Sequence, residues 1–245
     1  MKEQFPYGLD APYVVRNLAL AATACWLLFA LSFASWMPII VDGMAWPASF
    51  FSFGALWMLW SSAYGKLRER EKLLDVLRWT GQEKGLDIGC GRGLMAVGAA
   101  LRAPKGNVLA ADIWQQVDLS GNSPEALMIN ARRESVDQLI EIVTADMRAL
   151  PLPDHSIDTV VSSTAIHNVY DAVGRDKAID EIARVLKPSG QVLISDIRHL
   201  PQYMRRLRAA GFDVTLHRAA ASWIWRVISF GTLAPGVLVG HKRQG

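Results

Sequence analysis

Six residues near the middle of the chain have the types and the spacing of a binding site for a polar organic ligand. Three are glycines of one short segment and three are aspartates at or near the ends of apolar runs: Gly89, Gly91, Gly93, Asp87, Asp112 and Asp146. Glycines let the backbone turn tightly and approach a ligand, and a helix that starts after them offers free N–H groups to a carboxylate. An aspartate can accept both hydroxyls of a ribose or bind an exocyclic amino group. The set therefore predicts a ligand that carries hydroxyl, amino and carboxylate groups.

The glycine segment reads LDIGCGRG over residues 86–93, so its spacing is G-x-G-x-G. Dinucleotide dehydrogenases use G-x-G-x-x-G instead. A nicotinamide-dependent reductase would need that longer spacing and usually a Tyr-x-x-x-Lys pair, and the sequence has neither. This alternative is therefore the weaker one.

Two histidines, His167 and His199, follow later apolar runs and are candidates for catalysis. Histidine titrates near neutral pH and can take a proton from a nucleophile. His167 lies in SSTAIHNVYD, and His199 ends SDIRH, where Asp196 offers a second polar group. The alternatives are a hydrogen bond of His167 to the backbone at a strand end and an ordinary exposed loop position for His199. Asn168 and Tyr170 are weaker candidates.

The stretches between these residues have the pattern of a parallel sheet covered by helices. Five short runs are continuously apolar, as strands buried on both faces should be: residues 86–89, 107–112, 140–144, 157–162 and 191–196. Three intervening segments have apolar residues at helical spacing: residues 94–101, 124–135 and 176–186. The alternation predicts a doubly wound α/β fold, in which ligands bind beyond the carboxyl ends of the strands.

The C-terminal part departs from this alternation. Residues 200–210 have a helical pattern, and residues 212–217 and 235–241 look like strands with no clear helix between them.

Four segments together resemble the successive motifs of the class I S-adenosylmethionine-dependent methyltransferases. They are LDIGCGRG, the ADI that ends at Ile113, TADM with the following LPLPDHSIDTVVSS, and LKPSGQVLISD. The resemblance covers residues 84 to about 243, nearly all of the soluble part. It implies a seven-stranded Rossmann-like sheet with an antiparallel last strand, and S-adenosyl-L-methionine as the cofactor.

The resemblance also implies a role for each residue that matches a motif. Asp87, with the glycine loop, holds the methionine part of the cofactor, and Asp112 holds the ribose. Asp146 bonds the amino group of the adenine, while Ile113 and Met147 enclose the adenine ring.

Ser162, at the end of the fourth strand, is added to this cofactor-binding set, and His167 lies in the segment that faces the transferred methyl group in the family. The sequence departs from the family pattern at two places. Arg92 stands where many members have Thr or Ser, which puts a cation near the cofactor carboxylate. Residues 114–123 make an unusually long connector, which either covers the cofactor, shapes the acceptor pocket or is a plain surface loop.

An N-terminal stretch differs in composition from the rest of the chain. Residues 17–65 carry a single charged side chain, Asp42, whereas 26 basic and 23 acidic residues occur among all 245. Two apolar runs, residues 18–41 and 44–64, each reach the roughly 20 residues that cross a bilayer. They predict a two-helix transmembrane hairpin attached to a water-soluble domain.

The flanking charges predict how this hairpin is oriented. Arg16 precedes it and four cations follow it, whereas the connector near Asp42 has none: the four are Lys66, Arg68, Arg70 and Lys72. The positive-inside rule then places both termini and the catalytic domain on the cytoplasmic face of the membrane. Trp and Tyr near the ends of the runs favour an interfacial belt over two buried core helices. A secretory signal peptide is a further alternative, but its apolar region should span only about 7 to 15 residues.

These boundaries divide the chain into four parts. Residues 1–16 are a cytoplasmic N-terminal segment, residues 17–65 are the hairpin, and residues 66–83 are a connector that is amphipathic and helical up to residue 79. Residues 84–245 are the methyltransferase domain.

Other composition signals exclude or leave open further partners. Two cysteines, Cys25 and Cys90, cannot form a disulfide framework, and no His, Cys or Asp cluster has the spacing of metal ligands. The net charge of +3 is too small to imply nucleic acid. Residues 197–245 carry eight cations and one aspartate, which suits either an anionic lipid surface or a solvated face. The oligomeric state is open, and self-association through the transmembrane helices is one route to a homo-oligomer.

The sequence thus favours a membrane-anchored methyltransferase with a small lipophilic or membrane-associated acceptor. A non-catalytic scaffold that binds the cofactor is the main alternative, and the nicotinamide-dependent reductase is less favoured. A scaffold predicts eroded motifs, but the glycines and aspartates of the pattern are intact.

Overall fold

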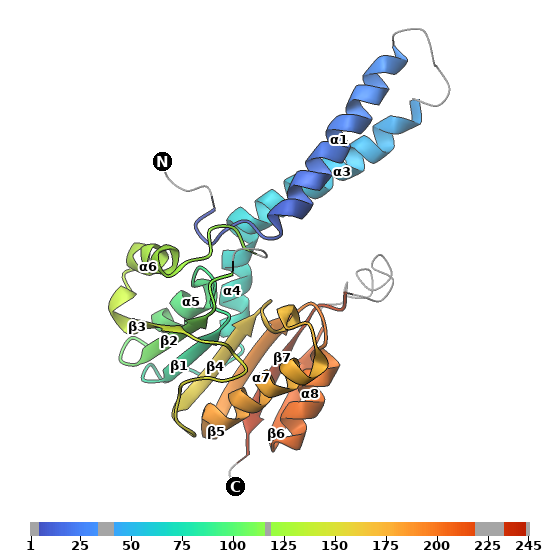
Figure 1. Ribbon diagram of the computed structural model, residues 1–245. Helices are drawn as coiled ribbons and strands as arrows, with labels where there is room; N and C mark the ends of the chain where they lie inside the picture. Colours follow the sequence, from blue (N-terminus) through green and yellow to red (C-terminus); the bar gives the residue numbers. More distant parts are fainter. Residues whose placement is uncertain (1–4, 34–41, 116–118, 219–232, 244–245) are drawn as a thin grey trace. The chain divides into compact units, whose positions relative to one another are not determined.

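The computed structural model describes residues 5–33, 42–115, 119–218 and 233–243 (Figure 1). The end of the first apolar run, residues 34–41, and Arg226 lie outside the described residues. The chain divides into two compact units. One comprises residues 1–68 with 115–122, and the other comprises residues 69–114 with 123–245.

The first unit is built on two apolar helices. Helix α1 (Pro12–Ser32) and helix α3 (Ala45–Trp60) pack side by side, and the π-helical turn η2 (Ser61–Gly65) continues α3 (Figure 1). A short 3-10 turn, η1 (Asp42–Met44), precedes α3. Small residues lie at the contact, since Ala22, Ala48 and Ala55 are buried. The large apolar side chains instead point outward: they include Leu20, Leu27, Leu31, Phe50, Phe53, Leu56 and Trp57. Small residues at the contact and large ones outside are typical of helices packed in lipid.

By length and hydropathy, one helix among the described residues is able to cross a membrane. It is the segment Pro12–Leu31, which has a mean hydropathy of 1.8 over its most apolar window. Helix α3 has 16 residues, so the predicted second span and the hairpin as a whole are not confirmed.

A polar anchor lies at the base of this unit. Lys66 donates to the carbonyls of Tyr7 and Gly8 at 3.2 and 2.9 Å and pairs with Asp10 at 2.7 Å. The long connector joins the same anchor, because the backbone N–H of Leu9 donates to Oγ of Ser120 at 2.9 Å. The connector after Asp112 therefore packs with the N-terminal segment of its own unit.

The second unit contains one seven-stranded sheet in the order β3-β2-β1-β4-β5-β7-β6. Its strands are β1 (Lys84–Ile88), β2 (Asn107–Asp112), β3 (Ile140–Thr144), β4 (Ile157–Ser163), β5 (Leu186–Asp196), β6 (Phe212–His217) and β7 (Gly236–Lys242). Strand β7 runs antiparallel to both β5 and β6, and the other pairs are parallel. The predicted doubly wound sheet with an antiparallel last strand is confirmed.

Helices cover both faces of the sheet (Figure 1). The face toward α7 (Ala172–Val185) and α8 (Leu200–Ala209) buries Leu86, Ile88 and Ile194. The opposite face packs against α4 (Lys66–Leu74), α5 (Leu94–Arg102) and α6 (Pro124–Arg133). Because both faces are covered, the inner strands are apolar throughout, which is why their runs could be read from the sequence.

Two helix boundaries differ from the prediction. The connector helix ends at Leu74 and not near residue 79, because the chain turns into β1 there, with the indole N–H of Trp79 donating to the carbonyl of Leu74 at 2.8 Å. Helix α7 begins at Ala172, four residues early, because the side chain of Asp171 caps it by accepting from the N–H of Gly174 at 2.6 Å.

Candidate active site

The glycine loop lies between β1 and α5, at the carboxyl end of the sheet. Gly89 and Gly93 have φ angles of 69° and 84°, which disfavour any side chain. A Cβ at Gly89 would also collide with the side chain of Ala165 in the loop after β4. The predicted glycine positions are therefore needed both for the turn and for the close approach of the neighbouring loop.

Asp87 lies in β1, beside this loop, and is unusual for a carboxyl group. It is 1% exposed, and neither of its oxygens has a hydrogen-bond partner. Burial raises the pKa of Asp87 to about 8, and the negative charge of Asp112 adds to this shift. The N–H of Ala96 opposes it but is not in hydrogen-bond geometry with either oxygen. Buried polar groups normally have partners, so an orphaned carboxyl group at this edge fits a ligand that supplies a donor.

Asp112 ends β2 and already organises the site. Its Oδ2 accepts the N–H of Gly91 at 2.8 Å, and its Oδ1 accepts the N–H of Trp114 at 2.6 Å. These bonds fix the carboxylate between the glycine loop and the start of the long connector.

The residues predicted around the adenine follow β2 and β3. Ile113 is 49% exposed beyond β2, and Met147 is partly buried against the core. Asp146 is held by Arg148, whose Nε and Nη2 lie 2.9 and 2.6 Å from its oxygens. The hydrogen bonds from Arg148 lower the pKa of Asp146. Asp146 and Arg148 line an open pocket of about 340 Å³ that is bordered on the other side by residues of α7, among them Gly174 and Lys177.

Two further side chains near the glycine loop, Ser162 and Cys90, are buried. Ser162 is buried, and its hydroxyl donates to the carbonyl of Ile88 at 2.9 Å, so it braces β1 against β4. Burial raises the pKa of Cys90 well above its usual value, with the charges of Asp87 and Asp112 adding to the effect. The thiol of Cys90 is therefore protonated and is no nucleophile.

His167 lies in a short 3-10 turn, η4 (Ile166–Asn168), after β4. Its Nδ1 is 2.5 Å from Oδ1 of Asp196, the last residue of β5, and its backbone N–H donates to Oδ2 of Asp196 at 3.1 Å. The side chain of His167 is 15% exposed. The ring orientation does not align an Nδ1–H with the oxygen, so the two atoms are in short contact without an aligned hydrogen bond.

His199 lies near the same edge, at the start of α8, with a left-handed backbone (φ 60°) and an exposed side chain. Burial of part of the ring and the charge of Arg175 lower the pKa of His199, while Asp196 opposes the shift. A positive charge on His167 would lower the pKa of His199 further. The structure thus brings both predicted histidines near Asp196. Of these two histidines, only His167 has a side-chain contact with Asp196 in the part of the chain that the structure describes.

Sequence reasoning missed Arg175, which shapes the loop that carries His167. It is buried, and its Nη1 donates to the carbonyls of Val169 and Tyr170 at 2.7 and 2.8 Å. A signal was available, because Arg175 precedes Ala178 and Ile179 by three and four residues and so falls on the apolar face of α7. Tyr170 itself is 97% exposed.

Metal chemistry has no support in this region. No group of three or more His, Cys, Asp or Glu side chains that could hold a metal ion occurs within the described part of the chain.

A comparison with known families agrees with this geometry. Residues 86–194 match a family model described as a methyltransferase domain. Over these residues, which are less than half of the chain, the chain is similar to methyltransferase domains. The match runs from β1 to β5, so it contains the glycine loop and the three aspartates, and it ends two residues before Asp196.

Relatives of the methyltransferase domain act on several small molecules according to their names. A demethylmenaquinone methyltransferase of Clavibacter sepedonicus is 33% identical over 147 residues, which are 60% of this chain and 53% of that protein. A malonyl-[acyl-carrier protein] O-methyltransferase of Methylovorus sp. is 32% identical over 160 residues, 65% of this chain and 51% of that protein. The chain spans about half the length of the curated relatives it matches.

Solved structures share the fold at low identity. A geranyl diphosphate methyltransferase in complex with S-adenosylmethionine has a TM-score of 0.60 at 16% identity, covering 78% of this chain and 90% of that one. The [4+2]-cyclase SpnF has a TM-score of 0.58 at 19% identity, covering 76% and 82%. The same fold thus occurs in a protein named as a cyclase, so the acceptor chemistry has to be argued from the site.

Proposed function

We propose that this chain is a membrane-associated methyltransferase that moves a methyl group from S-adenosylmethionine to a small lipophilic acceptor. The observation that carries the proposal is Asp87, a carboxyl group buried without a partner beside the glycine loop. A ligand that brings a cationic donor to it forms a charge-assisted hydrogen bond and removes an unfavourable buried group. When bound, the cofactor supplies this ammonium group and an electrophilic methyl group.

The other cofactor contacts follow from the positions of the side chains. The start of α5 after Gly93 presents N–H groups to the cofactor carboxylate. Asp112 receives the ribose hydroxyls, Asp146 receives the adenine amino group, and Ile113 and Met147 line the ring. Arg148 keeps Asp146 ionised and oriented for that contact.

On the acceptor side, His167 is the proposed base. The acceptor carries an O–H or N–H, and its proton moves to Nε2 of His167 as the oxygen or nitrogen is methylated. For a hydroxylated ring that is methylated at carbon, the hydroxyl proton moves to Nε2 while the ring carbon attacks the methyl group, and the C–H proton of that carbon then returns to the oxygen. The proton later passes from His167 to water, which restores the neutral ring. Nε2 fits this role because Nδ1 faces Asp196 and Nε2 makes no hydrogen bond among the described residues. His199 is proposed as a second polar contact for the acceptor.

Anchoring in the membrane is proposed to use two spans. Helix α1 is long and apolar enough for one span. The 16 residues of α3 and the 5 of η2 form a continuous helical path of about 30 Å at ~1.5 Å per residue, which suits a second span. Both termini and the catalytic domain then lie on the cytoplasmic side, as the flanking cations favour. Lys66 and Arg70 are partly withdrawn from this charge belt, because both are buried in ion pairs.

The acceptor class follows from the anchor and from the names of the relatives. An anchored catalytic domain has ready access to compounds that dissolve in the bilayer. Relatives are named for demethylmenaquinone and for other small molecules. Reduced demethylmenaquinone, which carries ring hydroxyls and an apolar tail, is therefore the first acceptor to try.

Methyl transfer is tested with the full chain in lipid nanodiscs. The protein is incubated with methyl-labelled S-adenosylmethionine and either a bacterial lipid extract or reduced demethylmenaquinone, and the products are identified by mass spectrometry. We expect label in a lipophilic product. Cofactor binding without transfer to any compound would favour the scaffold alternative, and absence of cofactor binding would refute both readings.

The topology is tested separately by cysteine labelling. A cysteine introduced at Gly43 should react with a membrane-impermeant reagent from outside intact cells, and a reporter fused after Gly245 should be cytoplasmic. Labelling of position 43 only after lysis would overturn the two-span arrangement.

A further inference from the structure

Asp196, the residue in contact with His167, is a fully buried carboxylate. Its side chain is 0% exposed. It accepts the N–H groups of Ile197 and His167 at 2.7 and 3.1 Å, and its Oδ2 lies 3.5 Å from the hydroxyl of Tyr203. Within the described ranges, no lysine or arginine lies at ion-pair distance from it. Among the described residues, His167 is the basic side chain at ion-pair distance from it.

We propose that Asp196 is the positioning residue for His167, an inference that rests on the proposed function. A carboxylate only accepts hydrogen bonds, so an Nδ1 held 2.5 Å from it must carry the proton of the neutral ring. This leaves Nε2 as the nitrogen that takes the proton of the acceptor. When the ring becomes an imidazolium, its positive charge forms next to a buried negative charge and is stabilised there. Only a small rotation of the ring is required to turn the contact into a hydrogen bond.

The same carboxylate also has a structural duty. Its Oδ2 binds the backbone N–H of His167, and its Oδ1 binds that of Ile197, so Asp196 fixes the turn η4 and the end of β5. A simple loss of activity in a variant would therefore not separate the two roles. The tautomer of His167 and the cofactor affinity together separate them. A purely structural loss in Asp196→Asn would lower stability and cofactor affinity without changing the tautomer of His167.

The test compares Asp196→Asn with the unaltered full chain in nanodiscs. The asparagine keeps its oxygen for the backbone N–H of His167. Its amide nitrogen replaces Oδ1, so it donates to Nδ1 and selects the wrong tautomer, and the bond from the N–H of Ile197 is lost. We expect the single-turnover rate of methyl transfer to reduced demethylmenaquinone to fall at least 10²-fold, as for other His–Asp pairs. The affinity for S-adenosylmethionine should stay within about threefold. The matched control is Asp158→Asn at the other end of the sheet, where Asp158 accepts the N–H of Lys84 at 2.9 Å, and its rate should stay within about threefold.

The tautomer is read from ¹⁵N spectra of histidine-labelled protein. The chain has five histidines, and the signal of His167 is identified by its loss in His167→Asn. We expect the Nδ1–H form in the unaltered chain and the Nε2–H form in Asp196→Asn. A rate within tenfold of the unaltered chain, or an Nε2–H form of His167 in the unaltered chain, would overturn the proposal.

The experiments distinguish a failure of the Asp196–His167 pairing from a failure of the proposed methyl transfer. If Asp196→Asn does not fold, the tautomer in the unaltered chain decides the question alone. If the unaltered chain binds cofactor but transfers no methyl group, the proposed function is wrong, while the tautomer still supports or overturns the pairing of Asp196 with His167.

Discussion

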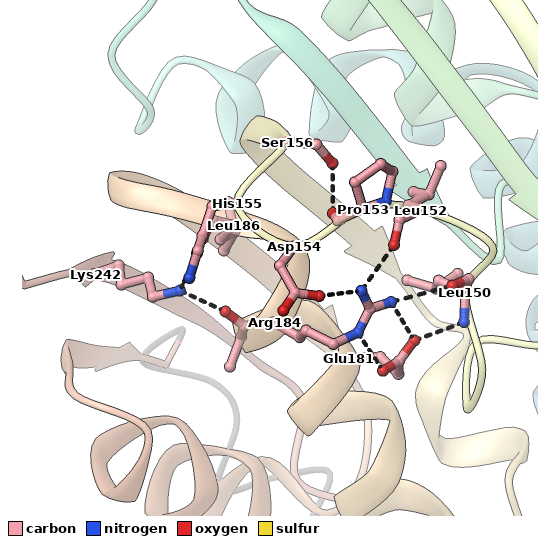
Figure 2. Close-up of polar contacts among 11 residues, drawn as sticks. Leu150, Leu152, Pro153, Asp154, His155, Ser156, Glu181, Arg184, Leu186 and Lys242 are labelled. Atoms are coloured by element: carbon pink, nitrogen blue, oxygen red, sulfur yellow. Dashed lines mark hydrogen bonds and ion pairs between the residues drawn. The ribbon is translucent and has the colours of Figure 1, made fainter.

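The two ends of the parallel sheet differ in how completely their polar groups are hydrogen-bonded. At the amino end, Arg184 of α7 uses all five of its N–H groups (Figure 2). They reach the carboxylates of Glu181 and Asp154 and the carbonyls of Leu150 and Leu152 at 2.7 to 3.0 Å. The guanidinium therefore ties the loop before β4 to the last turns of α7.

Lys242, at the end of β7, is equally well satisfied. It donates to the carbonyls of Ala183 and Leu186 at 2.6 and 2.7 Å and lies 3.2 Å from Nδ1 of His155 (Figure 2). Burial lowers the pKa of Lys242, and the charge of Asp154 partly offsets this shift. All three donors of the ammonium group thus have partners in the protein.

At the carboxyl end, some buried polar atoms have no hydrogen-bond partner. Asp87 is buried with no hydrogen bond, and Nδ1 of His167 faces a carboxylate without an aligned bond. Parallel sheets bind ligands at this end, and unsatisfied polar groups are kept where a ligand completes them. The hydrogen-bonded groups at the amino end stabilise the fold, whereas the unsatisfied groups at the carboxyl end are the ones proposed to bind the cofactor and the acceptor.

The largest effect is expected at the carboxyl end, in the variant His167→Ala. Removal of a general base lowers the rate by roughly 10²- to 10⁴-fold. Cofactor affinity should hardly change, because the proposed cofactor contacts lie mainly on β1, β2 and β3. The single-turnover rate, measured beside the dissociation constant, checks this. A fall of less than tenfold with an unchanged pH profile would remove His167 from the mechanism.

The amino end should respond in stability alone. Arg184→Gln loses most of five hydrogen bonds, and leaves buried carbonyls unpaired, so the free energy of unfolding should fall by roughly 2 to 3 kcal/mol. Urea unfolding measures the change. The affinity for S-adenosylmethionine should stay within about twofold in the folded variant, and a large loss of affinity would erase the distinction between the two ends.

Asp112→Ala should have the converse effect. It removes a charged acceptor for the ribose, and such hydrogen bonds contribute roughly 1.5 to 3 kcal/mol each, so affinity should fall at least tenfold. The domain should still fold, although the glycine loop loses the bond from Gly91. Calorimetry gives the affinity, and an unchanged value would refute the assignment of Asp112 to the ribose.

The smallest effect is expected on cofactor affinity in Arg148→Gln, next to the proposed adenine site. Arg148→Gln frees Asp146 from its exposed ion pair, so the carboxylate is less well oriented for the amino group. We expect a two- to fivefold loss of cofactor affinity, because exposed ion pairs contribute little. A gain in affinity would mean that Arg148 competes with the adenine and does not orient its partner.

The sequence could predict the strands because they follow a local rule, and the proposed cofactor residues could be placed near strand ends for the same reason. Buried parallel strands are apolar throughout, so the run of β2 is bounded correctly from residue 107 to residue 112. The glycines and aspartates are adjacent to strand ends and can be read from their spacing. Arg175 and Arg148 were missed because their roles depend on contacts that secondary-structure periodicity does not specify.

The bounds of the N-terminal apolar helices were harder to predict, for a related physical reason. Apolar composition predicts both runs as spans, but it does not show where a helix ends or changes to a π-helical turn, as happens at Ser61. The packing of residues 119 and 120 with the N-terminal segment was equally invisible, since it joins parts of the chain more than 100 residues apart.

The raised pKa of Asp87 makes both the stability of the fold and the proposed cofactor binding depend on pH. Its pKa in the folded protein, about 8, lies above the usual value of 3.8, so the group weakens the fold as pH rises from about 4 to about 8 when no cofactor is bound. At pH 7 the carboxyl group is mostly protonated. Pairing with the ammonium group of the cofactor favours the ionised form, so binding should release its proton.

The most direct test is therefore calorimetric titration of the full chain with S-adenosylmethionine at pH 7, in two buffers of different ionisation enthalpy. The unaltered chain should bind at micromolar concentrations and release close to one proton more than Asp87→Asn, which should bind at least tenfold more weakly. The affinity of the unaltered chain should also rise between about pH 6 and pH 8. Equal proton release and equal affinity in the two proteins would contradict the claim that the unsatisfied carboxyl group at this end of the sheet is a cofactor ligand.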